Sequence, residues 1–485
     1  MNDMDKLIEE IHARGMRLIL DLVINHTSDE HRWFKESRSS KDSPKRDWFI
    51  WRPAWYKDGN RMPPTNWQSF FGGSAWEWDE TTKEYYLHVF AKQQPDFNFE
   101  NEAARKALYA EFMTYWLEKE IDGFRVDTCA LYSKDQSFPD APIEDPDSEL
   151  QYPRDIAVNG PRIHEFLKEI GGLVSRYDAI TVGEYGAAPI ETTLKYVSKS
   201  RNELNMVFLF DILDVGMGRP YRFDVAPRSW NLPSITAAIA KTQSLINGTD
   251  AWTTVFLENH DIARSVSRYG DDGSPENWAM SAKMLSIIQS TLSGTQILYQ
   301  GQEIGMVNIP KDWPISEYID VESQAYWELW KKRNGSESEK ISNALVGLQH
   351  LSRDNARTPM QWEGRRTADL LQMRSNPGCG MINVAQQTGA DDSVLSCWKK
   401  MLAVRSQYSD LFVYGAFELV DQSNEHVLAY TKVMGSRKAY IVGNWTVQSQ
   451  PVPEISGRRK LLIGNVKGPE GSTLQPWDGR VYLVD

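Results

Sequence analysis

Hydrophobic residues follow two alternating spacings along the first part of the chain. Leu7, Ile8 and Ile11 recur at helical spacing, which predicts a helix that ends at Gly15. The next run, 16–24, is almost wholly apolar, as is typical of a strand buried on both faces of a parallel sheet. The pattern then repeats, with strands predicted at 121–126, 179–183, 206–210, 252–257 and 295–299 and helices at 102–119, 160–177, 190–199, 233–246 and 276–292.

Strands that alternate with helices predict a parallel sheet with right-handed crossovers. Six such strands are predicted, whereas a closed (β/α)8 TIM barrel needs eight. The fold expected is therefore an α/β TIM barrel whose first two strands are missing. Because strands 17–23 and 295–299 would then be unpaired edges, we expect the chain as given to fold poorly or to have little activity.

Other segments break the alternation. Residues 29–97 are rich in Trp, Pro and Gly and contain a predicted strand at 85–90, which indicates a small inserted domain. Residues 301–392 are long and polar, with a helical stretch near 320–333, and a last helix is predicted at 393–406. From about residue 407, short alternating runs such as Leu411–Leu419 predict an antiparallel β-domain. The predicted division is 1–28 for the first part of the barrel, 29–97 for the insertion, 98–406 for the rest of the barrel and 407–485 for the β-domain.

Charge and composition limit the partners. The 485 residues carry a formal net charge of −12, which disfavours nucleic acid and anionic membrane surfaces. No apolar run approaches the ~20 residues that cross a bilayer, and no secretory signal is visible. We expect a monomer that binds neither nucleic acid nor membrane.

Cysteine and tryptophan add one indication each. Cys129, Cys379 and Cys397 are too few for a disulfide framework, which favours a reducing compartment and a cytoplasmic location. The chain has 18 Trp residues, which is high for its length. Trp fills the cores of large barrels and also stacks on the flat faces of sugars, so both interpretations stay open.

Polar groups follow the ends of four predicted strands. The strands end at His26, at Asp127, at Glu184 and at the pair His260 and Asp261. Barrel enzymes carry their chemistry at the carboxyl ends of the strands. A single acid after a strand is commonly a helix cap, but four strands that end in this way indicate a catalytic rim.

Two of these carboxyl groups suit a retaining glycoside hydrolase, which needs a nucleophile and an acid ~5–5.5 Å apart. Asp127 suits the nucleophile, because Arg125 lies two residues earlier on the same side of the strand and favours the ionised form. Glu184 suits the acid, because nearby carboxylates would favour its protonated form. Asp261 would be a third carboxylate that holds sugar hydroxyls, and His26 and His260 would donate hydrogen bonds to the same sugar.

The histidines also allow other interpretations. Each could be a satisfied buried residue, or a metal ligand at a strand end. Metal hydrolases of this kind usually show closely spaced His pairs, and the chain has none. We therefore expect neither a metal site nor a cofactor.

Several ordered strings carry a family resemblance. Asp21–His26, Gly123–Asp127, Val182–Glu184 and Glu258–Asp261 resemble the signature regions of the α-amylase clan. Gln94–Asn98 and Arg357–Trp362 resemble strings of its fungal maltase and oligo-1,6-glucosidase (α-glucosidase) subfamily, and the likeness runs over the whole chain.

The resemblance implies roles for matching residues. Asp127 would be the nucleophile, Glu184 the acid/base and Asp261 the transition-state stabiliser. Some relatives hold calcium in a loop that belongs to the part expected to be missing, so calcium binding is left open. The residues implied to bind the non-reducing terminal glucose are His26, Arg125, His260 and Arg357.

One position bears on linkage. In yeast and fungal members the residue after the nucleophile is Val in isomaltases and Thr in maltases, and here it is Thr128. The resemblance therefore implies hydrolysis of α-1,4 links in maltose, and of sucrose and short oligosaccharides, in preference to α-1,6 links. The alternatives are a non-catalytic homologue, or an oligo-1,6-glucosidase or sucrose isomerase on the same scaffold.

Overall fold

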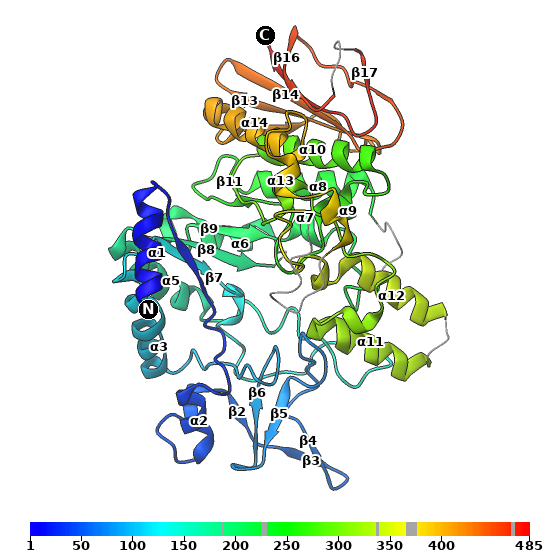
Figure 1. Cartoon of the computed structure of the whole chain (residues 1–485). Helices are drawn as coiled ribbons and strands as arrows, with labels where there is room; N and C mark the ends of the chain where they lie inside the picture. Colours follow the sequence, from blue (N-terminus) through cyan, green and yellow to red (C-terminus); the bar gives the residue numbers. More distant parts are fainter. Residues whose placement is uncertain (187, 225–229, 336–338, 365–375, 467–470) are drawn as a thin grey trace. The chain divides into compact units, whose positions relative to one another are not determined.

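The computed structural model describes the chain except residues 187, 225–229, 336–338, 365–375 and 467–470 (Figure 1). The contacts divide it into two compact units. The N-terminal unit comprises Met1–Leu209 and Asp250–Trp252, and the C-terminal unit comprises Phe210–Thr249 and Thr253–Asp485.

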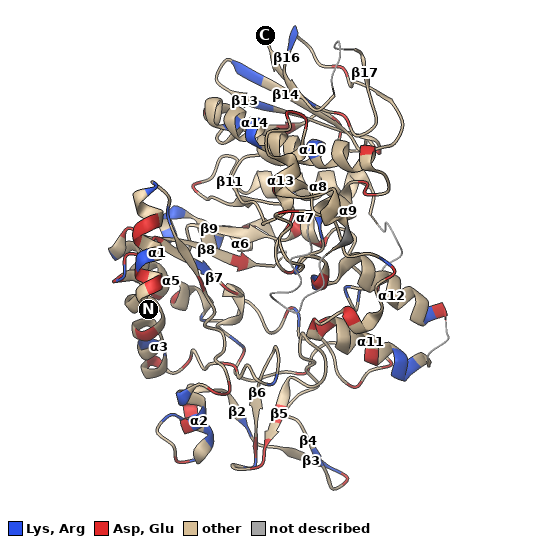
Figure 2. Ribbon diagram, viewed as in Figure 1, with Lys and Arg blue, Asp and Glu red and all other residues tan. Residues whose placement is uncertain are grey.

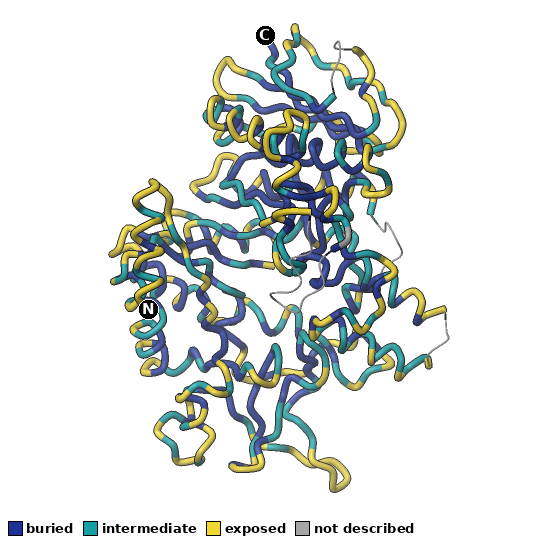
Figure 3. Tube along the Cα trace, in the orientation of Figure 1, coloured by how far each residue is buried: buried dark blue, intermediate teal, exposed yellow. Residues whose placement is uncertain are grey.

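A parallel sheet forms the centre of the N-terminal unit. Its order is β1-β7-β8-β9, and its strands are β1 (Ile19–Leu22), β7 (Gly123–Val126), β8 (Ile180–Tyr185) and β9 (Met206–Leu209). Gly123 begins β7 with φ +152°, and a Cβ there would lie 2.1 Å from Ile180 O, so only glycine allows this close pairing. β7, β8 and β9 are largely buried, whereas in the edge strand β1 only Leu22 is buried and Ile19 and Asp21 are exposed (Figure 3). The expectation that the run 16–24 is buried on both faces was therefore wrong.

Helices alternate with these strands as expected. They are α1 (Asn2–Ala13), α3 (Glu102–Leu108), α4 (Tyr115–Leu117), α5 (Ile163–Val174) and α6 (Ile190–Val197). The helix predicted at 102–119 is interrupted by a π-helical segment, Tyr109–Thr114, which the apolar spacing did not reveal. Acidic and basic residues are interleaved along α1 and α3 (Figure 2). This is typical of helices with one face in solvent.

The segment expected as an insertion has a small sheet of its own. Its order is β2-β6-β5, with β2 (Trp51–Arg52), β5 (Trp76–Asp79) and β6 (Glu84–Leu87); α2 (Arg32–Ser39) and the hairpin β3 (Trp55–Lys57) and β4 (Asn60–Met62) complete it. Trp67 and Trp76 are buried in its core, whereas Trp55 is 47% exposed. Tryptophan here serves mainly as core, although not at every position.

The C-terminal unit contains the last two parallel strands. These are β10 (Thr254–Val255) and β11 (Thr295–Gln296), which pair with each other. Their helices are α7 (Asp211–Asp214), α8 (Leu232–Ser244), α9 (Ser265–Tyr269), α10 (Pro275–Thr291), α13 (Val384–Gln387) and α14 (Val394–Gln407). The six predicted strands are thus present in two sheets, one in each unit. Their closure into one barrel remains a prediction, as do the expected domain boundaries.

The polar segment after β11 contains more helix than expected. It forms α11 (Val321–Asn334), which was predicted, and α12 (Glu339–Leu351), which was not. The buried residues Ile341, Ala344, Leu348 and Leu351 of α12 recur at helical spacing, so the sequence carried a signal for this helix that the prediction missed.

The predicted C-terminal antiparallel sheet is confirmed. Its order is β12-β13-β14-β18-β16, with β12 (Ala416–Leu419), β13 (Val427–Met434), β14 (Arg437–Asn444), β16 (Arg459–Gly464) and β18 (Gly479–Val484); β15 (Gln450–Pro451) pairs with β17 (Thr473–Leu474). The strand predicted at Leu411–Leu419 was wrong at its start, because Leu411 and Phe412 end the short helix α15 (Ser409–Phe412) and are buried.

Among the described helices, none is long and apolar enough to cross a bilayer.

Candidate active site

Two neighbouring strands of the N-terminal unit deliver the first pair of carboxyl groups. Asp127 follows the last residue of β7, and Glu184 lies near the end of β8, which pairs with β7 in parallel. Arg125 joins them, because its Nη1 lies 2.5 Å from Asp127 Oδ1 and its Nη2 lies 2.8 Å from Glu184 Oε2. The structure therefore brings together three residues that the sequence singled out.

Arg125 also contacts a third carboxylate. Its Nη1 donates to Asp21 Oδ1 at 2.8 Å from the neighbouring strand β1. Burial would lower the pKa of the guanidinium, but the charges of Glu184, Asp127 and Asp21 outweigh it and raise the pKa above its usual value. Arg125 is thus a permanently charged group that holds three carboxylates at one edge of the sheet.

The residue after Asp127 has a strained backbone. Thr128 adopts φ +42° in the left-handed region, which is rare for a β-branched residue and is typical of functional sites. In this conformation its backbone N–H donates to Glu184 Oε2 at 3.1 Å, and its Oγ1 donates to Asp127 Oδ2 at 3.2 Å. Thr128 therefore touches both carboxyl groups.

Glu184 accepts hydrogen bonds from two donors that the sequence argument did not include. The sequence argument placed it among carboxylates that would favour its protonated form. In the structure Arg125 Nη2 and the Thr128 N–H both donate to its Oε2, at 2.8 Å and 3.1 Å. The protonated form of Glu184 stays a prediction.

The layer beneath Glu184 is tightly packed. Cys129 Sγ lies 3.1 Å from Glu184 O, and a Cβ at Gly183 would lie 2.9 Å from the same sulfur. Burial raises the pKa of the Cys129 thiol well above its usual value, so the sulfur stays neutral. Cys129 acts here as packing and not as a nucleophile.

His26 belongs to a second network in the same unit. Its Nε2 lies 2.8 Å from Gln94 Nε2, and its backbone forms a bridge with Asp96. Burial lowers the pKa of His26, with Asp96 and Asp127 acting in the opposite direction, so the imidazole is neutral near pH 7. The segments Asp21–His26 and Gln94–Asn98, which each resemble a family string, therefore contact each other.

A buried lysine anchors this network. Lys134 Nζ lies 3.0 Å from Asp96 Oδ2, and donates to Asn25 Oδ1 at 3.2 Å and to Leu131 O at 2.7 Å. The ammonium is 2% exposed and the carboxylate is fully buried.

Among the described residues, no group of three or more His, Cys, Asp or Glu could hold a metal ion.

The C-terminal unit holds the third predicted carboxyl group. Arg357 Nη2 lies 2.6 Å from Asp261 Oδ1, and His260 Nε2 lies 3.2 Å from Asp261 Oδ2. Arg353 Nη1 also reaches Asp261 Oδ1, at 3.1 Å. Burial would raise the pKa of Asp261, but His260 and the arginines outweigh it and hold the pKa below its usual value.

Two members of this second cluster were not predicted. Asp320 Oδ2 accepts from Arg353 Nη2 at 2.8 Å and from Arg357 Nη1 at 3.1 Å, so each arginine bridges both carboxylates. Asp320 is also the N-cap of α11. Arg353 and Asp320 lie in the segment taken as a polar loop, where the only available signal was the spacing of Arg353 four residues before Arg357.

Glu258, the first residue of the string Glu258–Asp261, makes structural contacts and does not join the Asp261 cluster. Glu258 is 1% exposed and accepts from Ser265 N at 2.9 Å and from Arg264 Nη1 at 3.1 Å. It therefore holds the start of α9 and does not face outward with its neighbours in the sequence.

Comparisons with known proteins identify the family. The family model for the α-amylase catalytic domain matches residues 1–415. An α-glucosidase of Candida albicans is 46% identical over 100% of this chain and 86% of its own length, and oligo-1,6-glucosidase IMA3 of Saccharomyces cerevisiae is 42% identical over 99% and 84%. A variant of isomaltulose synthase from Erwinia rhapontici NX5, solved in complex with its natural substrate sucrose, matches with a TM-score of 0.92 and 34% identity over 100% and 86%. The chain is therefore a glycoside hydrolase of the α-amylase family, with an α/β fold and a C-terminal antiparallel sheet, and is closely related to the fungal α-glucosidases and oligo-1,6-glucosidases.

Proposed function

We propose that the chain is a retaining, maltase-like α-glucosidase that releases terminal α-1,4-linked glucose from maltose and short oligosaccharides, and that also cleaves sucrose. The observation that carries this proposal is the joint hold of Arg125 on Asp127 and Glu184 at the ends of adjacent strands. A retaining mechanism needs two carboxyl groups about 5–5.5 Å apart, and a guanidinium shared by both supports such a placement.

The mechanism follows from these positions. Asp127 attacks the anomeric carbon while Glu184 protonates the leaving glycosidic oxygen, which gives a covalent glucosyl ester and a free aglycone. Water then attacks the ester, Glu184 takes its proton, and Asp127 leaves as a carboxylate. Two inversions give net retention.

Asp261 is proposed as the stabiliser of the positively charged transition state. Its low pKa keeps it anionic over the working pH range, which is what electrostatic stabilisation of an oxocarbenium ion requires. His26, Arg125, His260 and Arg357 are proposed to bind the terminal glucose.

The linkage preference is assigned to Thr128. Its hydroxyl contacts Asp127 Oδ2, so it lies beside the carboxylate that attacks the sugar. Thr at this position is typical of the maltases in the family, and the proposal follows that pattern.

Chemical rescue separates the two roles. Asp127→Ala should be almost inactive on an activated aryl α-glucoside, and azide should restore turnover by entering the vacated face to give the β-glucosyl azide. Glu184→Ala should give the α-glucosyl azide instead, because the covalent ester forms normally and azide needs no base. NMR of the products identifies the anomers. If both variants yield the same anomer, the two roles are assigned wrongly.

A second candidate is isomerisation of sucrose on the same residues. The likeness to isomaltulose synthase, whose natural substrate is sucrose, favours testing it. Product analysis with sucrose decides: glucose and fructose in equal amounts indicate hydrolysis, and a sucrose isomer indicates transfer. Comparing turnover of maltose and isomaltose tests the oligo-1,6-glucosidase alternative in the same assay. If the folded protein turns over none of these sugars, the non-catalytic alternative holds.

A further inference from the structure

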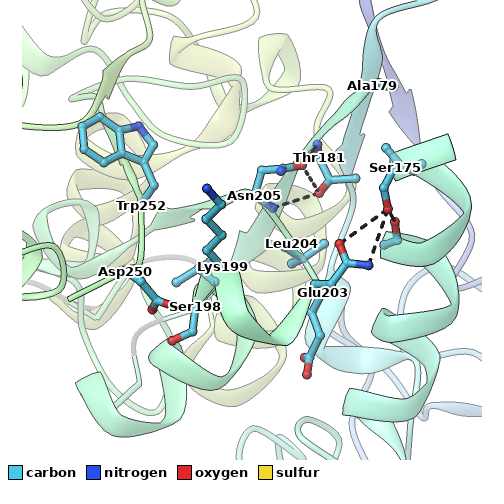
Figure 4. Close-up of a pocket in the computed structure, with 14 residues that line it drawn as sticks. Ser175, Ala179, Thr181, Ser198, Lys199, Glu203, Leu204, Asn205, Asp250 and Trp252 are labelled. Carbon is cyan, nitrogen blue, oxygen red and sulfur yellow. Dashed lines mark hydrogen bonds between the residues drawn. The ribbon is translucent and has the colours of Figure 1, made fainter. Parts of the chain in front are cut away.

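A pocket of about 480 Å³ lies in the N-terminal unit at the amino ends of β8 and β9 (Figure 4). Thr181 and Asn205 from the two strands line it, together with the end of α5, the turn around Lys199 and residues 250–252. Thr181 precedes Glu184 by three residues, which is about 10 Å along a strand. The pocket therefore lies at the opposite end of the sheet from the proposed catalytic carboxylates.

The pocket has an apolar base and a fixed amide. Val174, Ala179 and Leu204 line the base and are buried. Asn205 Oδ1 accepts from Thr181 N at 2.7 Å and from Thr181 Oγ1 at 3.1 Å, which fixes the orientation of the amide (Figure 4). Because the carbonyl oxygen is used in this way, the amide nitrogen keeps its two N–H donors for another group.

The charges of the pocket are balanced. Asp250 accepts from the backbone N–H of Ser200 at 3.1 Å, and this hydrogen bond lowers the pKa of its carboxyl, so it is an anion at neutral pH. Lys199 supplies one cation and forms no ion pair among the residues described. Glu203 also borders the pocket, but its carboxylate is fully buried against Arg201. A site with one available cation and one available anion does not favour phosphate, a nucleotide or a metal ion.

A tryptophan completes the lining. The half-buried Trp252 lies on the same side as Lys199 and Asp250, as Figure 4 shows. A flat indole, an amide donor and a carboxylate acceptor around an apolar base match a pyranose, which has apolar C–H faces and a rim of hydroxyl groups. The volume suits one or two sugar rings.

We infer that this pocket is a second carbohydrate site, which binds a neutral glucose or maltose unit apart from the catalytic residues. Trp252 stacks on the sugar face, Asp250 accepts hydroxyl hydrogens, and Lys199 and the Asn205 amide donate to hydroxyl oxygens. The inference does not depend on the linkage that the enzyme cleaves.

Fluorine NMR of the full chain tests the site directly. The chain carries 5-fluorotryptophan and Asp127→Asn, which prevents hydrolysis, and Trp252→Phe assigns the Trp252 resonance. Maltose should shift that resonance in a saturable manner. Lys199→Ala and Asp250→Ala should each weaken this binding about tenfold, the usual effect of losing one good hydrogen bond or charge contact.

Two matched controls define the outcome. Lys168→Ala changes an exposed lysine of α5 that does not line the pocket, and Arg125→Met changes the catalytic cluster; both should leave the Trp252 titration unchanged. A resonance that does not move with glucose or maltose overturns the inference. So does one that moves with inorganic phosphate instead, or one whose shift persists unaltered in both Lys199→Ala and Asp250→Ala.

Discussion

The two charged clusters of the molecule differ in how their charges are paired. In the N-terminal unit one guanidinium, Arg125, is shared by Asp21, Asp127 and Glu184. In the C-terminal unit Arg353 and Arg357 each bridge Asp261 and Asp320, and a further pair, Arg222 and Glu322, adjoins them through Arg353.

This difference predicts different sensitivities. In the first cluster three carboxylates share a single cation, so the loss of that cation removes the shared partner of all three. The second cluster is balanced and redundant, so its central carboxylate stays anionic in a fixed position. The first arrangement suits groups that react, and the second suits a group that only supplies charge.

Replacement of Arg125 should have the largest effect. Arg125→Met leaves three carboxylates without their shared cation, and kcat/KM for maltose should fall about 10⁴-fold, which corresponds to about 5.5 kcal/mol. Arg125→Lys keeps the positive charge but loses the two-pronged guanidinium that contacts Asp127 and Glu184 together, and it should retain more activity than Arg125→Met. Steady-state kinetics with circular dichroism as a folding control measure this. If Arg125→Met costs no more than a single change at Arg353, the difference between the clusters is not real.

A buried lysine of the C-terminal unit extends the comparison to a cation that pairs with no carboxylate among the described residues. Lys432 donates to Gly415 O at 2.5 Å and to Ser293 Oγ, and burial, with Arg405 nearby, lowers its pKa to about 7. The unfolded chain therefore binds the proton more tightly than the fold does between pH 7 and 10.5. Stability should rise with pH across this window, and the penalty below pH 7 is on the order of 5 kcal/mol.

Denaturant midpoints between pH 6 and 10 test this dependence. Lys432→Met should flatten the rise in the free energy of unfolding, whereas Lys460→Met, at an exposed position in β16, should keep it. An unchanged slope in Lys432→Met would show that the lysine stays protonated in the fold.

Lys134 tests a paired buried charge in the other unit. Lys134→Met leaves Asp96 buried without its cation and should lower the free energy of unfolding by about 3 kcal/mol. Urea denaturation measures the loss, and the exposed Lys92→Met is the control. The double variant Lys134→Met with Asp96→Asn removes both charges and should recover part of the stability. If the double variant loses more free energy of unfolding than the two single variants lose together, the ion pair is not the source of the effect.

Arg353 and Arg357 test the redundancy of the balanced cluster. Arg353→Lys or Arg357→Lys alone should lower kcat/KM only about 30-fold, or about 2 kcal/mol, because the other guanidinium still bridges Asp261 and Asp320. The double variant should lose more than the product of the two single effects. Simple multiplication of the losses would show that the two arginines act independently.

The sequence predicted the first cluster better than the second for a physical reason. Asp127 and Glu184 each come at the end of an apolar strand, and parallel pairing alone brings such ends together. Arg353 and Asp320 meet because α11 and the turn after α12 fold back on each other, and no local spacing encodes that contact. That limit does not apply to α12, because its buried residues Ile341, Ala344, Leu348 and Leu351 recur at helical spacing and could have been recognised. The left-handed conformation of Thr128 was also out of reach, because a β-branched residue gives no local signal for it.

The smallest expected effect is on linkage preference. Thr128→Val keeps the shape of the side chain but removes the hydroxyl that contacts Asp127 Oδ2 at 3.2 Å. The ratio of kcat/KM for isomaltose to that for maltose should rise about tenfold, or about 1.4 kcal/mol. Thr128→Ser retains the hydroxyl and should keep the original ratio, which separates hydrogen bonding from backbone strain. If Thr128→Val slows both sugars equally, Thr128 only supports the conformation at Asp127, and the choice of linkage must lie in groups that contact the second sugar.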